Sequence, residues 1–177
     1  MRVFGLKANI VQMDAEALAF PDNHFDFVWS WGVIHHSSNT RRVLKEIHRV
    51  LKPGGVSTLM VYHRGLWNYY ILGGLFRGFL QGAWLKTRSL QKTIQSWTDG
   101  AMARYYSPLE WKSLLSEFFR VERIFVLGTK MDLIPLPAGP LKERVSRLFP
   151  NAAARLMTNR CRMGSFLVST VTKPDGN

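Results

Sequence analysis

The chain has 177 residues, of which 46% are hydrophobic and 20% charged, so it can bury the core of one globular domain. Its 24 Lys and Arg residues outnumber its 12 Asp and Glu residues, and the net charge of +12 favours contact with an anionic partner such as a membrane surface or a nucleic acid. The one cysteine, Cys161, excludes an intramolecular disulfide, and MRVFGLKANI lacks the apolar run of a signal peptide, so we expect a cytoplasmic protein.

The first predicted strand covers residues 10–13 (IVQM), and Asp14 follows at its carboxyl end. A carboxylate only accepts hydrogen bonds, so Asp14 can serve a donor on a ligand. The alternative is that Asp14 caps a turn through its own backbone, which is common in loops. The neighbouring Glu16 is expected to be solvated.

The second predicted strand covers residues 25–30 (FDFVWS). It places three aromatic side chains on one face, namely Phe25, Phe27 and Trp29. Because the other face is also largely apolar, the pattern predicts a central strand that is covered on both sides.

The loop after this strand runs from Ser30 to His36. Gly32 allows the backbone to pass close to a ligand, and Trp31 suits either a ligand contact or the core. His35 and His36 are adjacent in sequence and point apart. Since no cysteine or carboxylate cluster accompanies them, we expect no metal site.

Ser38 or Asn39 is predicted to cap a helix. The apolar residues of this helix form one stripe, which consists of Val43, Leu44, Ile47, Val50 and Leu51. Pro53-Gly54-Gly55 then ends the helix and leads into a further strand over residues 56–62.

Residues 12–64 contain a series of motifs in a fixed order: Asp14-Ala15-Glu16, Leu18, Phe20-Pro21, Phe25-Asp26, the loop from Ser30 to His36, and Glu46-Ile47 before Arg49-Val50-Leu51-Lys52-Pro53-Gly54-Gly55. This series closely resembles the middle of the type 11 class I S-adenosylmethionine-dependent methyltransferases. The resemblance implies an α/β fold with a Rossmann-like class I methyltransferase sheet and S-adenosyl-L-methionine as the cofactor. The implied activity is methyl transfer to a small, lipophilic acceptor. The alternatives are an inactive truncated methyltransferase fragment and a basic protein that associates with a membrane surface or with RNA.

The resemblance also assigns roles to individual residues. Asp14 would accept a hydrogen bond from the exocyclic amine of adenine, and Ala15 would approach the ring. Ser30 and Trp31 fall at the cofactor side of their loop. His36 would serve as the base for a protonated acceptor, and the alternative is a packed or capping histidine.

Residues 1–10 contain no counterpart of the glycine-rich loop with which this family opens. We therefore expect an N-terminally truncated single domain, with a cofactor-side core (1–64), a helical cap (65–106) and a C-terminal part (107–177). Such a sheet would leave residues 25–30 at an open edge, which favours self-association, and cofactor binding would be weak. Size-exclusion chromatography and calorimetry test both expectations.

The most apolar stretch, residues 66–85, approaches the length of a membrane span, which needs about 20 apolar residues. Four glycines and the central Arg77 argue against a span. We favour a helical cap, inserted after the fifth strand of the family's sheet, over a lipophilic acceptor. The alternative is peripheral membrane contact through residues 66–88.

Residues 98–100 are predicted to form a turn, and Arg104 or Tyr105 is expected either to border the acceptor pocket or to anchor the chain. A helix over residues 108–118 follows. Its predicted start is a capping box, which consists of Ser107, Pro108 and Glu110.

The remaining predicted elements are strands over residues 121–127 and 165–172 and helices over 141–149 and 152–157. Between residues 141 and 162 there are six Lys or Arg residues and one acidic residue. Such a patch suits phosphates. Because no nucleic-acid motif accompanies it, we expect solvated charge and no nucleic-acid partner.

Overall fold

The computed structural model describes residues 5, 8–80, 85, 88, 89, 92, 102–136 and 139–175, with residues 76–80 described through their backbone alone. The predicted turn at 98–100 and residues 81–84 of the apolar stretch lie outside the described residues. The elements are β1 (Phe25–Trp31), η2 (Ile34–His36), α1 (Thr40–Val50), β2 (Leu51–His63), η3 (Leu66–Leu80), β3 (Tyr105–Tyr106), α4 (Pro108–Ser116), β4 (Arg120–Leu127), α5 (Lys130–Leu133), α6 (Pro140–Leu148), α7 (Asn151–Arg155), η4 (Leu156–Arg160) and β5 (Phe166–Thr172).

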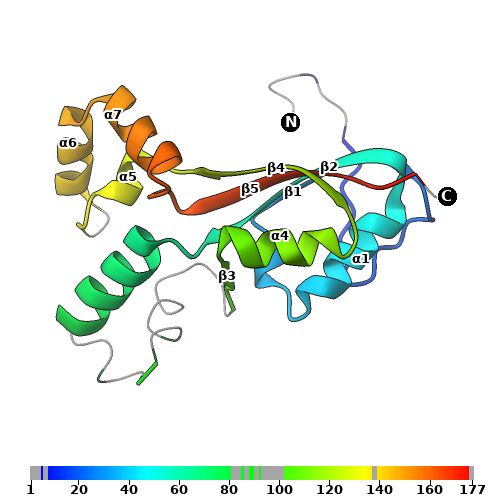
Figure 1. The fold of residues 1–177 in the computed structure, drawn as a ribbon, viewed down its shortest axis with the longest axis horizontal. Helices are drawn as coiled ribbons and strands as arrows, with labels where there is room; N and C mark the ends of the chain where they lie inside the picture. The colour runs from blue at the N-terminus through cyan, green and yellow to red at the C-terminus, as the bar shows by residue number, and fades with distance from the viewer. Residues whose placement is uncertain are drawn as a thin grey trace.

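The strands form one sheet with the order β1-β2-β5-β4 (Figure 1). β1 and β2 are parallel, whereas β5 runs antiparallel to both of its neighbours, β2 and β4. The short β3 pairs in parallel with the end of β2. The predicted α/β sheet of Rossmann-like type is therefore confirmed, and its one reversed strand is β5.

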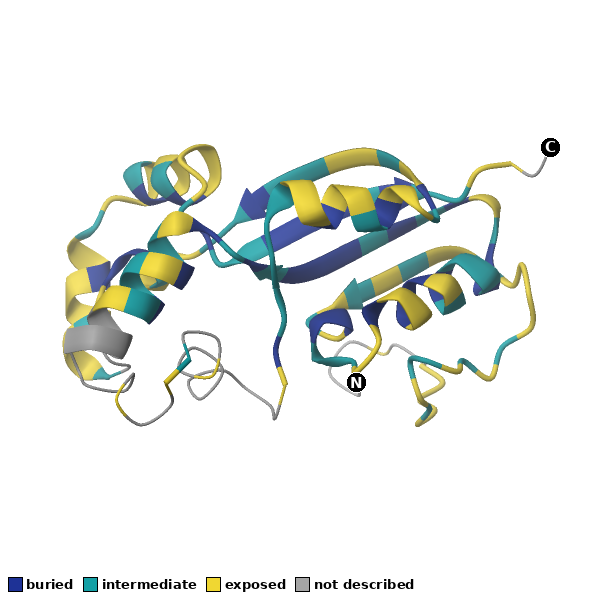
Figure 2. Cartoon of the chain, turned by 60° about the horizontal axis from the view of Figure 1, so that its bottom comes forward, coloured by how far each residue is buried: buried dark blue, intermediate teal, exposed yellow. Residues whose placement is uncertain are grey.

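Helices α1 and α4 lie on the same side of the sheet (Figure 1). Asn39 caps α1 by accepting a hydrogen bond from the Arg42 amide, so the second of the two predicted caps is the correct one. The capping box of α4 is present as predicted. The buried core under both helices includes Leu44, Leu59, Trp111, Leu115 and Leu167, and Figure 2 shows β2 and β5 as strongly buried strands.

β1 lies at the edge of the sheet, and among the described residues it pairs only with β2. Its aromatic side chains are open to solvent: Phe27 is 50% exposed, Trp29 59% and Trp31 41%. The prediction of a strand covered on both faces is therefore wrong. The apolar residues on both faces of β1 do not by themselves reveal whether other elements of the chain cover each face. Among the described residues, the other edge of β1 has no partner strand.

The strand predicted over residues 10–13 is not formed. Ile10 is 80% exposed and Val11 55% exposed, and these residues join none of the ladders of the described sheet. A strand is stable only when a neighbour satisfies its backbone groups, so apolar sequence alone does not make one.

The remaining helices gather away from α1 and α4. Helices α5, α6 and α7 cluster at one end of the sheet, and η3 extends from the end of β2 (Figure 1). η3 follows β2 as the predicted helical cap does. Within the described part of the chain, no helix has both the length and the apolarity needed to cross a membrane.

Candidate functional site

The turn that begins at Asp14 is closed by its own side chain. The Asp14 carboxylate accepts a hydrogen bond from the Glu16 amide (Oδ1···N 2.8 Å), which is the turn-capping arrangement. Asp14 is exposed, and its second oxygen makes no hydrogen bond to any residue that the structure describes. Ala15 is half-buried against the core. Asp14 therefore closes a turn and still presents one acceptor oxygen to solvent.

Glu16 joins this turn to the start of α1. Its Oε1 atom accepts hydrogen bonds from Ser37 Oγ (2.6 Å), Ser38 Oγ (2.7 Å) and the Asn39 amide (2.9 Å). These donors, those of Ser37 and Ser38 first, lower the pKa of Glu16 to about 2. The prediction of a solvated Glu16 is therefore wrong. The sequence signal for this bridge was the pair of serines immediately before the helix cap, because their hydroxyls need an acceptor such as a carboxylate.

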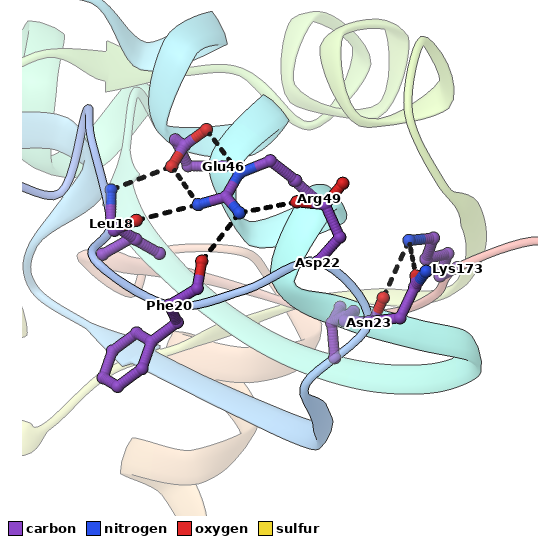
Figure 3. Close-up of polar contacts among 8 residues, drawn as sticks. Leu18, Phe20, Asp22, Asn23, Glu46, Arg49 and Lys173 are labelled. Carbon is purple, nitrogen blue, oxygen red and sulfur yellow. Dashed lines mark hydrogen bonds and ion pairs between the residues drawn. The ribbon is translucent and has the colours of Figure 1, made fainter.

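The segment after this turn is fixed to α1 by Arg49 (Figure 3). The guanidinium donates to the carbonyls of Leu18 (2.8 Å) and Phe20 (2.7 Å) and pairs with Asp22 (2.7 Å) and Glu46 (2.8 Å). Glu46 also accepts from the Leu18 amide (2.8 Å), and its bond with Arg49 lowers the pKa of Glu46. This network holds the loop between Glu16 and β1 in place.

The loop after β1 follows Trp31 at the other end of this strand. Ser30 is half-buried near the end of β1, and Trp31 stacks on Trp29 with ring centroids 5.2 Å apart. Gly32 has a φ angle of 76°, a conformation that favours glycine. Gly32 therefore provides the backbone freedom that the sequence predicted at this point.

His36 is half-buried and oriented by the backbone. Its Nδ1 atom lies 2.7 Å from the carbonyl oxygen of Met102. A carbonyl only accepts, so Nδ1 carries the proton, and in the neutral ring the lone pair is on Nε2. This is the tautomer that a general base requires at Nε2.

His35 is fully buried between His36 and Tyr62, with ring centroids 4.2 Å and 3.9 Å away. Within the described part of the chain, neither of its ring nitrogens has a hydrogen-bond partner of normal geometry. Burial, followed by the charge of His36, lowers the pKa of His35 to about 4, although the Met60 backbone opposes this. His35 is therefore a neutral core residue.

The state of His35 predicts a loss of stability in acid. The pKa of His35 in the folded state, about 4, is below the usual 6.5. The contribution of His35 to the free energy of unfolding is therefore complete above pH 6.5 and is lost as the pH falls toward 4. The loss of unfolding free energy reaches up to about 3 kcal/mol. Urea unfolding from pH 7 to pH 4 measures it, and His35→Phe should flatten the slope. An unchanged slope in this variant would contradict the assignment.

A cleft of about 830 Å³ is lined by Met102, whose carbonyl oxygen contacts His36, although His36 itself is not part of the lining. Its walls come from the start of α1, the end of β2, the helix η3, the segment around β3 and α4. The lining residues are Ser38, Asn39, Thr40, Arg41, Arg64, Tyr69, Met102, Arg104, Tyr105, Tyr106, Glu110 and Leu114.

The segment before β3 connects this cleft to the histidine loop. The Arg104 amide donates to the His35 carbonyl (2.9 Å), and Met102 accepts from His36. Arg104 also donates from Nη2 to the Ser38 carbonyl (2.6 Å). Arg104 therefore both borders the cleft and anchors the chain. Tyr69 and Arg41 were not foreseen, because their place in the cleft depends on segments far apart in sequence.

No group of three or more His, Cys, Asp or Glu side chains suited to a metal ion occurs among the residues that the structure describes.

Residues 2–59 match a protein-family model that is described as "Methyltransferase domain". The ubiquinone/menaquinone biosynthesis C-methyltransferase UbiE of Pseudoalteromonas translucida is 45% identical over 53 residues, which are 29% of this chain and 21% of that protein. The uncharacterized protein YafE of Escherichia coli is 30% identical over 104 residues, which are 58% of this chain and 42% of YafE. The chain thus covers less than half the length of these relatives.

Solved structures agree with the fold. The [4+2]-cyclase SpnF superposes with a TM-score of 0.58 at 18% identity, covering 99% of this chain and 60% of SpnF. A SAM-dependent methyltransferase from Methanosarcina mazei gives a TM-score of 0.53 at 18% identity, covering 93% of this chain and 66% of that one. At such identities the similarity concerns the fold alone.

Proposed function

Because this chain is related to the class I S-adenosylmethionine-dependent methyltransferases over residues 2–59, we propose that it takes part in methyl transfer to a small, lipophilic acceptor. One observation carries the proposal: Glu16 joins the turn at Asp14 to the loop of His36, and His36 is bonded to Met102 in the wall of a large cleft. The carboxylate of Asp14, the proposed base His36 and the cleft for the acceptor are thus connected in this order through hydrogen bonds and neighbouring residues.

The residues on the cofactor side fit S-adenosylmethionine. The free oxygen of Asp14 suits the exocyclic amine of adenine, because that amine needs an acceptor. Ala15 offers a small apolar contact, and Ser30 and Trp31 border the backbone at Gly32. When bound, S-adenosylmethionine supplies a methyl group that its sulfonium has already activated.

The cleft would hold the acceptor. Tyr69, Tyr105 and Tyr106 give it aromatic walls that suit an apolar molecule, and η3 contributes Tyr69 as the cap residue. With an activated donor, the protein mainly has to hold the two reactants in line and exclude water.

His36 would take the proton of the acceptor atom. Its Nδ1 proton is held by Met102, so Nε2 is left to receive a proton as the acceptor becomes methylated. An acceptor without such a proton would not need this step.

The cofactor assignment predicts the effect of Asp14→Asn. Asparagine retains an oxygen for the Glu16 amide and replaces the free oxygen with a donor, which repels the adenine amine. We expect S-adenosylmethionine binding to weaken by about 1–3 kcal/mol in titration calorimetry. Asp26→Ala is the matched control, since Asp26 pairs with Lys52 on the surface. Equal affinity in wild type and Asp14→Asn would refute the assignment.

A further inference from the structure

The charges around the cleft are unequal. Three arginines and one carboxylate line it, namely Arg41, Arg64, Arg104 and Glu110. Arg64 forms an ion pair with Glu110, whose other oxygen accepts from the Ser107 amide (2.9 Å) and hydroxyl (2.8 Å). The only carboxylate of the lining is therefore already occupied.

The two remaining arginines differ. Arg41 pairs with Glu117 (2.7 Å) and is well exposed to solvent. Arg104 is half-buried, and among the residues that the structure describes no carboxylate pairs with it. Its Nη2 bond to the Ser38 carbonyl fixes the plane of the guanidinium. The other donors of this guanidinium make no hydrogen bond to a described residue.

An oriented, half-buried guanidinium with free donors suits a carboxylate or a phosphate, because these anions match its planar fork. The neighbouring surface is aromatic. The ring of Tyr105, next to Arg104, packs on Tyr69 with centroids 5.1 Å apart and on Tyr62 at 5.3 Å. The cleft therefore places one cation at the border of an aromatic wall.

We propose that the cleft binds a small aromatic molecule that carries an anionic group, with the anion on Arg104 and the ring against Tyr69 and Tyr105. This inference rests on the proposed function, in which the cleft holds the methyl acceptor, and it narrows the acceptor class to aromatic anions. The acceptor would then carry its lipophilic ring at one end and its negative charge at the other.

The test compares two probes of the same shape, 2-naphthoate and the neutral 2-naphthamide, by fluorescence titration with the full chain. The wild-type protein should bind 2-naphthoate roughly tenfold more tightly than 2-naphthamide, as expected for one charge-assisted hydrogen bond. Arg104→Gln keeps a donor for the Ser38 carbonyl and should bring the affinity ratio of the two probes to about one. Arg104→Lys should restore part of the preference.

Arg120→Gln is the matched control, because Arg120 lies outside the lining of this cleft and, like Arg41, already has a carboxylate partner, Glu122. It should keep the wild-type ratio. Equal affinity of wild type for the two probes, binding of neither, or an unchanged ratio in Arg104→Gln would overturn the proposal. Since the ratio needs no methyl transfer, its outcome is separate from that of the proposed activity.

The carboxylate of the cofactor is a second source of the same chemistry. Titration of naphthoate in the presence of S-adenosylhomocysteine shows whether Arg104 binds the anion of the acceptor or the carboxylate of the cofactor. Retained naphthoate binding supports an acceptor site at Arg104, whereas competitive displacement would overturn the acceptor assignment.

Discussion

His36→Gln is expected to slow methyl transfer to a phenolic probe that also carries a carboxylate, 6-hydroxy-2-naphthoate, by about a thousandfold. Glutamine can still donate to the Met102 carbonyl, so the loop keeps its contact with the cleft wall. It has no lone pair comparable to that of Nε2, and the phenolic proton then has no acceptor. Transfer of a labelled methyl group gives the rate.

The control for His36→Gln is cofactor affinity. It should equal that of wild type in calorimetry, because His36 is assigned to the acceptor side. A rate within a few-fold of wild type would show that His36 is only a packed residue, and a parallel loss of cofactor affinity would indicate a folding role.

Trp111→Ala is expected to lower the free energy of unfolding by about 3–5 kcal/mol. Trp111 is fully buried between α4 and the sheet, and its Nε1 atom donates to Ser169 Oγ on β5 (3.1 Å). Its ring also contacts Tyr106, which lines the cleft. Alanine would leave a large cavity, and the Ser169 hydroxyl would lose the donor Trp111 while keeping its own bond to the Leu59 carbonyl (3.2 Å). Urea unfolding measures the loss.

Leu109 provides the matched control on the same helix. It is 82% exposed, so Leu109→Ala should change stability by no more than about 0.5 kcal/mol. Trp111→Phe fills most of the space and should cost about 1–2 kcal/mol through the lost hydrogen bond and remaining gap. Similar losses for the variants at 109 and 111 would mean that the packing of α4 does not depend on Trp111.

Much of the fold was predictable because its signals are local. The helix stripe from Val43 to Leu51, the stop at Gly54 with a φ angle of 72°, and the capping box at Ser107 each depend on residues within a few positions. The structure confirms the stripe from Val43 to Val50 and the capping box. The helix α1 ends at Val50, however, so Leu51 opens β2, and Pro53-Gly54-Gly55 lies within that strand and not at the end of the helix as predicted.

The failures arose where the outcome depends on distant partners. Residues 10–13 have the composition of a strand, but the described sheet offers them no neighbour. The prediction for Glu16 failed because its donors at Ser37 and Ser38 lie twenty residues away in sequence, and only the fold brings them within hydrogen-bond distance.

Sequence motifs point to only part of the candidate site. The resemblance to the methyltransferases assigns Asp14 and Ser30 to the cofactor and His36 to the acceptor, and these assignments stay predictions. The cleft, by contrast, combines residues from five separate segments, such as Arg41, Tyr69 and Arg104. No periodicity or spacing links these positions. That Arg104 has no carboxylate partner among the described residues therefore emerges only when its neighbours are known.

The position of β5 in the sheet has a consequence for biosynthesis. The ribosome makes β5 after β1, β2 and β4, yet β5 lies between β2 and β4 and pairs with both. Until residues 166–172 emerge, the facing edges of β2 and β4 have no partner. Such edges bind other chains, and closure of distant contacts is slow. The nascent chain should therefore depend on chaperones late in synthesis.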